Sequence, residues 1–209
     1  MEKIDYKKAL SAFYRASAKQ VVDVDVPKMR FLMIDGHGDP GVAAEYKAAL
    51  EALYPVAFGL KFLAKKGDLA IDYGVMPLQG LWWADDMNDF INGRRDRWLW
   101  TLMIMQPEFI SEAMFEEVCA NVRAKKAPGR LGDIRLDGFD EGPAAQILHV
   151  GPYSEEGPTI QRIHEHIESH GHQLSGKHHE IYLGDPRKSA PERLKTILRQ
   201  PWSAEKEPN

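Results

Sequence analysis

The sequence predicts an α+β fold that is built from two repeated units sharing a sheet. Two observations lead to this class. Strand-like segments alternate with amphipathic helical segments. The order strand, glycine turn, helix and returning strand also occurs twice, with Gly36 in the first turn corresponding to Gly151 in the second. Internal repetition outranks single motifs as a fold-level signal, so we expect the two halves to have the same architecture.

The first half is predicted from hydrophobic periodicity and turn residues. Tyr6, Leu10 and Phe13 lie at helical spacing, and valine alternates with aspartate before Pro27, which is typical of a half-exposed strand. The expected elements are a helix over 4–17, strands over 21–26, 29–35 and 98–105, and helices over 42–54 and 108–123, the last of which Pro107 starts.

The second half repeats this order after a linker at 125–129. The expected elements are a strand over 146–150, a turn over 151–158, a helix over 158–170 with Gly171 as its C′ residue, a strand over 179–183 and a last helix over 191–199. We therefore expect a single domain over residues 1–209. Its parts are repeat one at about 20–106, a connecting helix at about 107–124 and repeat two at about 130–200.

Composition excludes several classes of protein. The chain has 209 residues, 44% apolar residues, a net charge of −4 and one cysteine. This is an ordinary globular composition without a disulfide framework, and it is compatible with a reducing compartment. The acidic balance gives no general attraction to nucleic acid, no apolar run is long enough to span a membrane, and the charged N-terminus is not a secretory signal. We expect a cytoplasmic protein that binds neither nucleic acid nor membrane.

The glycine turn of the first half matches a dinucleotide-binding fingerprint, Gly36-x-Gly38-x-x-Gly41, between a strand and a helix. The fingerprint also needs an acidic residue about 20 positions later. That region, Leu60–Ala64, contains Lys61 and no acid, and the corresponding second turn lacks the pattern. Glycines that permit a tight turn explain the match better.

The histidines near the second helix are a weak metal signal. His166 and His170 lie at i and i+4, but the segment is not H-E-x-x-H and no cysteine lies nearby. We interpret them as a solvated polar face, and we expect neither a metal nor another cofactor. Cys119 is predicted to be a small buried residue in a helix.

Aromatic residues crowd into one stretch of the first half. Four of the five tryptophans are Trp82, Trp83, Trp98 and Trp100, and Tyr73 precedes them. Strand alternation sends Trp82 and Trp83 to opposite faces and places Trp98 and Trp100 on one face. One stripe can therefore line a cavity while the other packs the core.

The second half contributes a carboxylate and two tyrosines. Tyr153 lies in the glycine turn, and Glu180 and Tyr182 share one face of a strand. A glutamate in an apolar strand is unfavourable unless it is exposed, paired or functional. Aromatic walls with one carboxylate suit flat, apolar or cationic ligands. The alternative is that the tryptophans only pack the core and that Glu180 lies on a wet face.

A set of segments in both halves carries a family resemblance: Gly36–Pro40, Glu45–Ala48, Tyr73–Leu78, Gly80–Trp83, Trp100–Pro107, Leu148–Tyr153, Gly171-His172 and His179–Pro186. Over roughly residues 20–200 the chain thereby resembles the GyrI-like small-molecule-binding family. One position departs from the expected pattern, since Gln79 stands where an acid is expected in Pro-Leu-x-Gly.

The resemblance implies two tandem β-α-β-β repeats that form a pseudo-twofold antiparallel sheet, with a ligand groove between the halves. Relatives are effector-binding domains of multidrug-responsive regulators, and in them a groove glutamate, matched here by Glu180, meets cationic aromatic ligands. A stand-alone subfamily with a Trp-rich first half is similar to cyclopropanoid cyclopropyl hydrolases. These hold DNA-alkylating compounds in an aromatic cage, for which Trp82, Trp100, Tyr153 and Tyr182 are the candidates here, followed by Trp83 and Trp98.

We therefore expect a protein that binds small aromatic xenobiotics and hydrolyses electrophilic cyclopropane compounds, which would protect the cell. Burial would suit Glu180 to move a proton to or from water, and Tyr153 or Tyr182 would donate a hydrogen bond to the leaving oxygen. The alternatives are a sensor or sequestering protein without catalysis, or an inhibitor of a protein partner such as gyrase. The thirty or so residues before the first repeat are too few for a DNA-binding head, which argues against direct transcription control.

Overall fold

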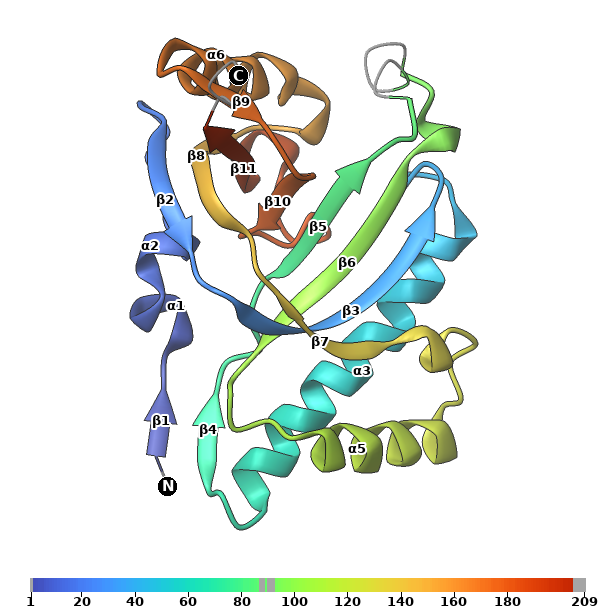
Figure 1. The fold of residues 1–209 in the computed structure, drawn as a ribbon. Helices are drawn as coiled ribbons and strands as arrows, with labels where there is room; N and C mark the ends of the chain where they lie inside the picture. Colours follow the sequence, from blue (N-terminus) through green and yellow to red (C-terminus); the bar gives the residue numbers. More distant parts are fainter. Residues whose placement is uncertain (1, 87–88, 90–92, 205–209) are drawn as a thin grey trace, which may run out of the picture. The chain divides into compact units, whose positions relative to one another are not determined.

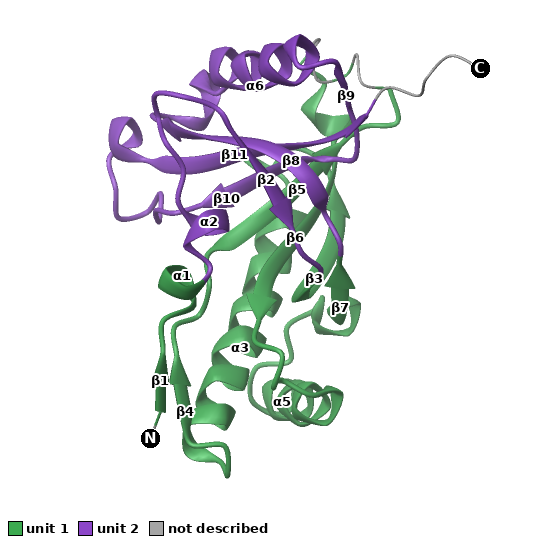
Figure 2. Cartoon of the chain, turned by 60° about the vertical axis from the view of Figure 1, so that its left-hand side comes forward, with its two compact units in different colours: residues 1–9, 29–139 green, residues 10–28, 140–209 purple. Residues whose placement is uncertain are grey.

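The structure is a computed structural model that describes residues 2–86, 89 and 93–204. The chain divides into two compact units, which Figure 2 colours separately. Unit 1 comprises residues 1–9 and 29–139, and unit 2 comprises residues 10–28 and 140–209. Both units combine helices with antiparallel strands, so the predicted α+β class is confirmed.

In unit 1, four antiparallel strands lie in the order β5-β6-β3-β7 (Figure 1). A short parallel pair, β1 with β4, lies apart from them. The elements are β1 (Glu2–Ile4), α1 (Tyr6–Ala9), β3 (Met29–His37), α3 (Ala44–Lys66), β4 (Ile71–Tyr73), β5 (Leu78–Trp83), η1 (Arg95–Arg97), β6 (Leu99–Gln106), α5 (Glu112–Lys125), η2 (Leu131–Asp133) and β7 (Arg135–Phe139).

Helix α3 packs against both β3 and α5. It was expected to end near residue 54, but it continues through Pro55 to Lys66, because its small and apolar face stays buried along the whole length. A Cβ atom at Gly59 would lie 2.4 Å from the Val118 side chain, so this glycine allows α5 to approach closely. Helix α5 begins at Glu112 rather than after Pro107, because the Ser111 side chain accepts a hydrogen bond from the Met114 amide and caps it.

In unit 2, the strands lie in the order β2-β8-β11-β10, and β9 pairs with the far end of β11. The elements are α2 (Ser11–Tyr14), β2 (Val22–Val26), β8 (Gly142–Val150), η3 (Tyr153–Glu155), α6 (Gly157–Ser169), β9 (His172–Leu174), β10 (His178–Tyr182), η4 (Pro191–Arg193) and β11 (Lys195–Ala204).

The two units repeat one topology. The series β3, α3, β5, β6 in unit 1 corresponds to β8, α6, β10, β11 in unit 2, and the strand order within each sheet is the same. The two β-α-β-β repeats are therefore confirmed. In each unit one further strand, β7 or β2, pairs with the first strand of the repeat.

The two faces of the unit 2 sheet differ in character. On one face, Ile163 and Ile167 of α6 pack against Ala145, Ile147 and Leu198. Since directly opposed residues share a face, Glu180, Tyr182 and Thr196 lie on this same side as Leu198.

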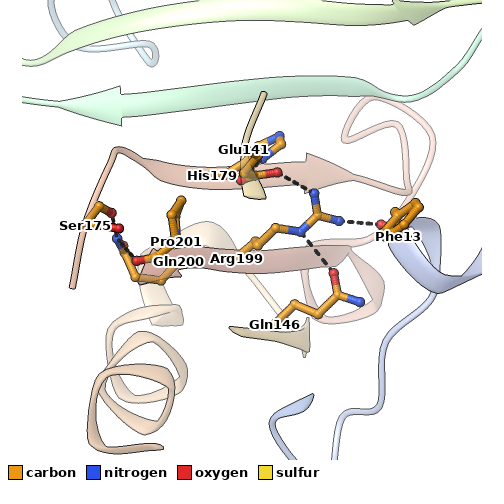
Figure 3. A network of polar contacts seen from close by, with 8 residues as sticks. All are labelled: Phe13, Glu141, Gln146, Ser175, His179, Arg199, Gln200 and Pro201. Carbon is orange, nitrogen blue, oxygen red and sulfur yellow. Dashed lines mark hydrogen bonds and ion pairs between the residues drawn. The ribbon is translucent and has the colours of Figure 1, made fainter. Parts of the chain in front are cut away.

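The opposite face holds a buried polar network around Arg199 (Figure 3). Its guanidinium group donates hydrogen bonds to the Glu141 carboxylate at 2.8 Å, to the Gln146 side-chain oxygen at 3.0 Å and to the Phe13 carbonyl at 2.6 Å. His179 bonds the other Glu141 oxygen at 2.7 Å. Burial alone would raise the pKa of Glu141, but His179 and Arg199 overcome it and lower the pKa to about 2. This network ties the strands of unit 2 to the segment that precedes β2.

Two predicted helices are wrong. Residues 4–17 do not form one helix, because Leu10 leaves helical geometry and separates α1 from α2. Residues 191–199 form a 3₁₀ turn and the first half of β11, not a helix. Ile197 and Leu198 point to opposite faces of β11 and both are fully buried, because this strand lies between β8 and β10 with both faces covered. A strand buried on both faces loses the alternation that distinguishes it from a helix.

Candidate functional site

The predicted second-half residues come together in unit 2. Glu180 and Tyr182 lie two residues apart on β10 and therefore point to the same face. The Tyr182 hydroxyl donates a hydrogen bond of 2.6 Å to Glu180 Oε2. His178, on the same face, places Nε2 3.6 Å from Glu180 Oε1. The carboxylate is thus held in one orientation by its own strand.

Tyr153 joins this group from the glycine turn. It begins η3, and its ring meets the Tyr182 ring edge-on with centroids 5.7 Å apart. Its side chain is exposed, at 40% of its full accessible surface. Unit 2 therefore presents an aromatic pair beside a hydrogen-bonded carboxylate, which is the combination that suits a flat or cationic molecule.

A second glutamate, which the sequence did not single out, interacts electrostatically with Glu180. Glu156 precedes α6 and is 4% exposed. Burial and, to a smaller extent, the Glu180 charge raise the pKa of Glu156 to about 9, although the Thr196 hydroxyl acts in the opposite direction. In the sequence Glu156 looks like an ordinary acid before a helix, as does the exposed Glu155, and only burial separates the two.

The predicted tryptophans gather in unit 1. Trp82 and Trp100 are directly opposed on β5 and β6, and Trp98 meets Trp82 edge-on at 6.1 Å. Tyr46 of α3, which the sequence did not single out, stacks on Trp82 at 6.3 Å and meets Trp100 edge-on at 5.4 Å. Trp82 is 4% exposed and Trp100 is fully buried.

Two further predicted residues do not join this cluster in the contacts described. Trp83 alternates with Trp82 and so points to the other face of β5. Tyr73 packs edge-on against Tyr6 and Phe109 near the β1–β4 pair, where burial raises its pKa. A groove formed jointly by residues of the two units stays a prediction.

The glycine fingerprint has a packing explanation. Gly36 is directly opposed to Trp100, and a Cβ atom at position 36 would lie 2.1 Å from the indole ring. Gly38 has a φ of +91°, which glycine adopts without strain. The glycines thus admit the Trp100 ring and turn the chain.

The remaining polar clusters have other partners. His166 lies 3.2 Å from an Asp23 oxygen and beside His170. Within the described residues, no group of three or more histidine, cysteine, aspartate or glutamate side chains is placed to hold a metal ion. A hollow of about 340 Å³ in unit 1 is lined by His37, Leu99, Arg97 and several aspartates, and its described lining includes none of the predicted site residues.

Comparison with known families matches the description "GyrI-like small molecule binding domain" over residues 20–201. The chain belongs to the GyrI-like family. A small-molecule-binding function follows from this membership. None of the helices in the described part of the chain is long and apolar enough to cross a membrane.

Two solved structures from Listeria innocua are similar over nearly the whole chain. One, described as an uncharacterized conserved protein, is 41% identical with a TM-score of 0.86, and covers 96% of this chain and 100% of its own. The other, described as a hydrolase, is 40% identical with a TM-score of 0.84, at the same coverage. The EcmrR C-terminal domain, at 12% identity, a TM-score of 0.55 and coverage of 88% and 98%, shares the fold. No curated protein matches.

Proposed function

We propose that this GyrI-like protein binds small aromatic xenobiotics and hydrolyses electrophilic compounds that carry a strained cyclopropane ring, which protects the cell. The observation that carries the proposal is the Tyr153–Tyr182–Glu180 arrangement, in which a fixed carboxylate lies beside two aromatic rings. The hydrolase description of a 40% identical relative supports a reaction with water.

Glu180 is the proposed base. In the reaction, the oxygen of a water molecule bonds to a ring carbon, and Glu180 takes the water proton. The strained carbon–carbon bond breaks, and its electrons move to a conjugated carbonyl oxygen of the substrate, which must then gain a proton. Tyr182 already donates its hydrogen bond to Glu180, so its proposed part is to aim the carboxylate.

Aromatic side chains would orient the substrate and exclude bulk water. In unit 2 this part falls to Tyr153. In unit 1 we propose Trp82 and Trp100 for the same part, with Trp83, Trp98 and Tyr73 as further candidates. The buried indole N–H of Trp100 has no hydrogen-bond acceptor among the described residues, which supports a contact with a ligand acceptor.

The test incubates the protein with an electrophilic cyclopropane compound conjugated to a carbonyl and identifies what is released by mass spectrometry. We expect the product with one water added, and Glu180→Gln and Tyr182→Phe should both reduce its rate of formation. Glu192→Gln, an exposed change, is the matched control and should keep the native rate. Release of the intact compound would instead identify a sequestering protein, and native rates for both variants would refute the assignment.

A further inference from the structure

A buried carboxyl group that the proposed hydrolysis leaves unused lies close enough to Glu180 for the two charges to interact. Glu156 is fixed by its backbone, since its carbonyl accepts the amide N–H bonds of Thr159 and Ile160 at the start of α6, both at 2.9 Å. The residue is only 4% exposed, and among the described residues its Oε1 atom has no hydrogen-bond partner. A carboxyl group in such a place is unfavourable as an anion, because burial removes the water that would stabilise the charge and the Thr196 hydroxyl only partly offsets this loss.

The elements around Glu156 bring several polar groups to the same face. Tyr182 on β10, Thr196 on β11 and His149 on β8 are directly opposed across three strands. The His149 ring is hydrogen-bonded to the Thr159 hydroxyl through Nδ1 at 3.0 Å and to the Pro152 carbonyl through Nε2 at 3.3 Å. The titratable groups on these elements include Glu180, His178 and Tyr182 of β10, His149 of β8, Tyr153 and Glu155 of η3, and His164 of α6.

The two carboxyl groups have unequal surroundings. Glu180 accepts the hydrogen bond of Tyr182, and His178 Nε2 lies 3.6 Å from its Oε1 atom. Of the two carboxyl groups, Glu180 is therefore the one with a hydrogen-bond donor and a basic ring close to it. Glu156, by contrast, has a buried Oε1 atom that finds no hydrogen-bond partner in the part of the chain that the structure describes. When two interacting carboxyl groups have such different environments, one is protonated while the other is ionised, because a second negative charge is repelled by the first.

We propose that Glu156 and Glu180 hold one proton between them and act on a bound substrate as a single acid–base pair. The inference rests on the proposed function and completes its proton balance. Glu180 takes the proton of the attacking water while the proton kept at Glu156 is given up to the oxygen that ring opening releases. The pair starts and ends with one proton, so moving that proton from Glu180 back to Glu156 restores the resting state without an outside acid.

The first experiment observes the proton directly and needs no substrate. The protein labelled with ¹³C at the glutamate carboxyl carbon is titrated by NMR. We expect one carboxyl signal to titrate near pH 9, to vanish in Glu156→Gln and to move to lower pH in Glu180→Gln. The adjacent exposed variant Glu155→Gln is the matched control and should leave the signal unchanged. If every carboxyl titrates below pH 6, or if Glu180→Gln leaves the high signal in place, the shared proton is refuted.

The second experiment measures the pH profile of cyclopropane hydrolysis. Glu156→Gln keeps the shape of the side chain and removes the transferable proton. We expect kcat to fall by about 100-fold or more, with loss of the alkaline limb, while the Kd of an analogue without the cyclopropane ring changes by less than about twofold. A native kcat and pH profile in this variant would refute the acid–base pair. An inactive wild-type protein would refute the hydrolysis, whereas the titration would still decide whether the proton is shared.

Discussion

Replacing Glu156 by glutamine should stabilise the protein, and the gain should grow with pH. The pKa of this group is raised from 4.5 to about 9, mainly by burial. Between these pH values the folded state binds a proton that the unfolded state releases, so the stability of the wild type falls as pH rises. From pH 4.5 to pH 7 the loss amounts to about 3 kcal/mol, at about 1.4 kcal/mol for each pH unit. Glutamine does not titrate, so the stability of Glu156→Gln does not fall with pH for this reason.

The assay is urea denaturation followed by circular dichroism for wild type and Glu156→Gln at pH 4.5 and pH 7. The difference between the two proteins should increase by about 3 kcal/mol between these pH values, which moves the urea midpoint by roughly 1 M or more. Any change in packing caused by the amide cancels in this comparison, because it is present at both pH values. Glu155→Gln, which changes an exposed neighbour, should follow the wild-type curve. Parallel curves for wild type and Glu156→Gln would refute the reasoning, since Glu156 would then be ionised in the folded protein.

Two further predictions concern the cores of the units. Glu141→Gln should destabilise the protein by roughly 3–5 kcal/mol in urea titrations at pH 7, because it leaves buried Arg199 without its anion. Because folding lowers the pKa of Glu141, the stability that this carboxylate contributes is present above pH 4.5 and is lost as pH falls toward 2. The stability difference between wild type and Glu141→Gln should therefore shrink over this pH range, and a constant difference would contradict the ion pair. Gly36→Ala should lower the free energy of unfolding by about 1–3 kcal/mol and alter tryptophan fluorescence, because the new Cβ atom would overlap the Trp100 ring. Gly74→Ala is the control and should be nearly neutral, because a Cβ atom there meets open space. Equal effects of the two variants would show that the Trp100 ring moves aside freely.

Local pattern was a good guide where an element has one buried face. The alternation of valine and aspartate located β2, and the apolar stripe of α6 located that helix within one residue at each end. The repeated order of elements predicted the matching topologies of the two units. Pattern was misleading at β11, where burial of both faces removes the alternation, and in α3, where packing carries the helix through a proline.

The candidate site divides in the same way. Glu180, Tyr182 and Tyr153 were predicted because a charged residue with an aromatic residue on one face of an apolar strand, and an aromatic residue in a turn, are visible in the sequence. Unit 2 brings these residues together. Tyr46 was missed because an aromatic residue on a helix stripe has the same pattern whether it packs a core or a tryptophan pair.

The sequence by itself determined the α+β class, the internal repeat, the GyrI-like family and the carboxylate with its aromatic neighbours. These depend on residue type and on spacing along the chain. Only the tertiary structure decided that Glu156 is buried and interacts with the Glu180 charge while Glu155 is exposed, and that Glu141 is paired with Arg199. The physical reason is that the charge state of a carboxyl group depends on its loss of water and on the charges that folding brings near it, and neither quantity is carried by the order of residues.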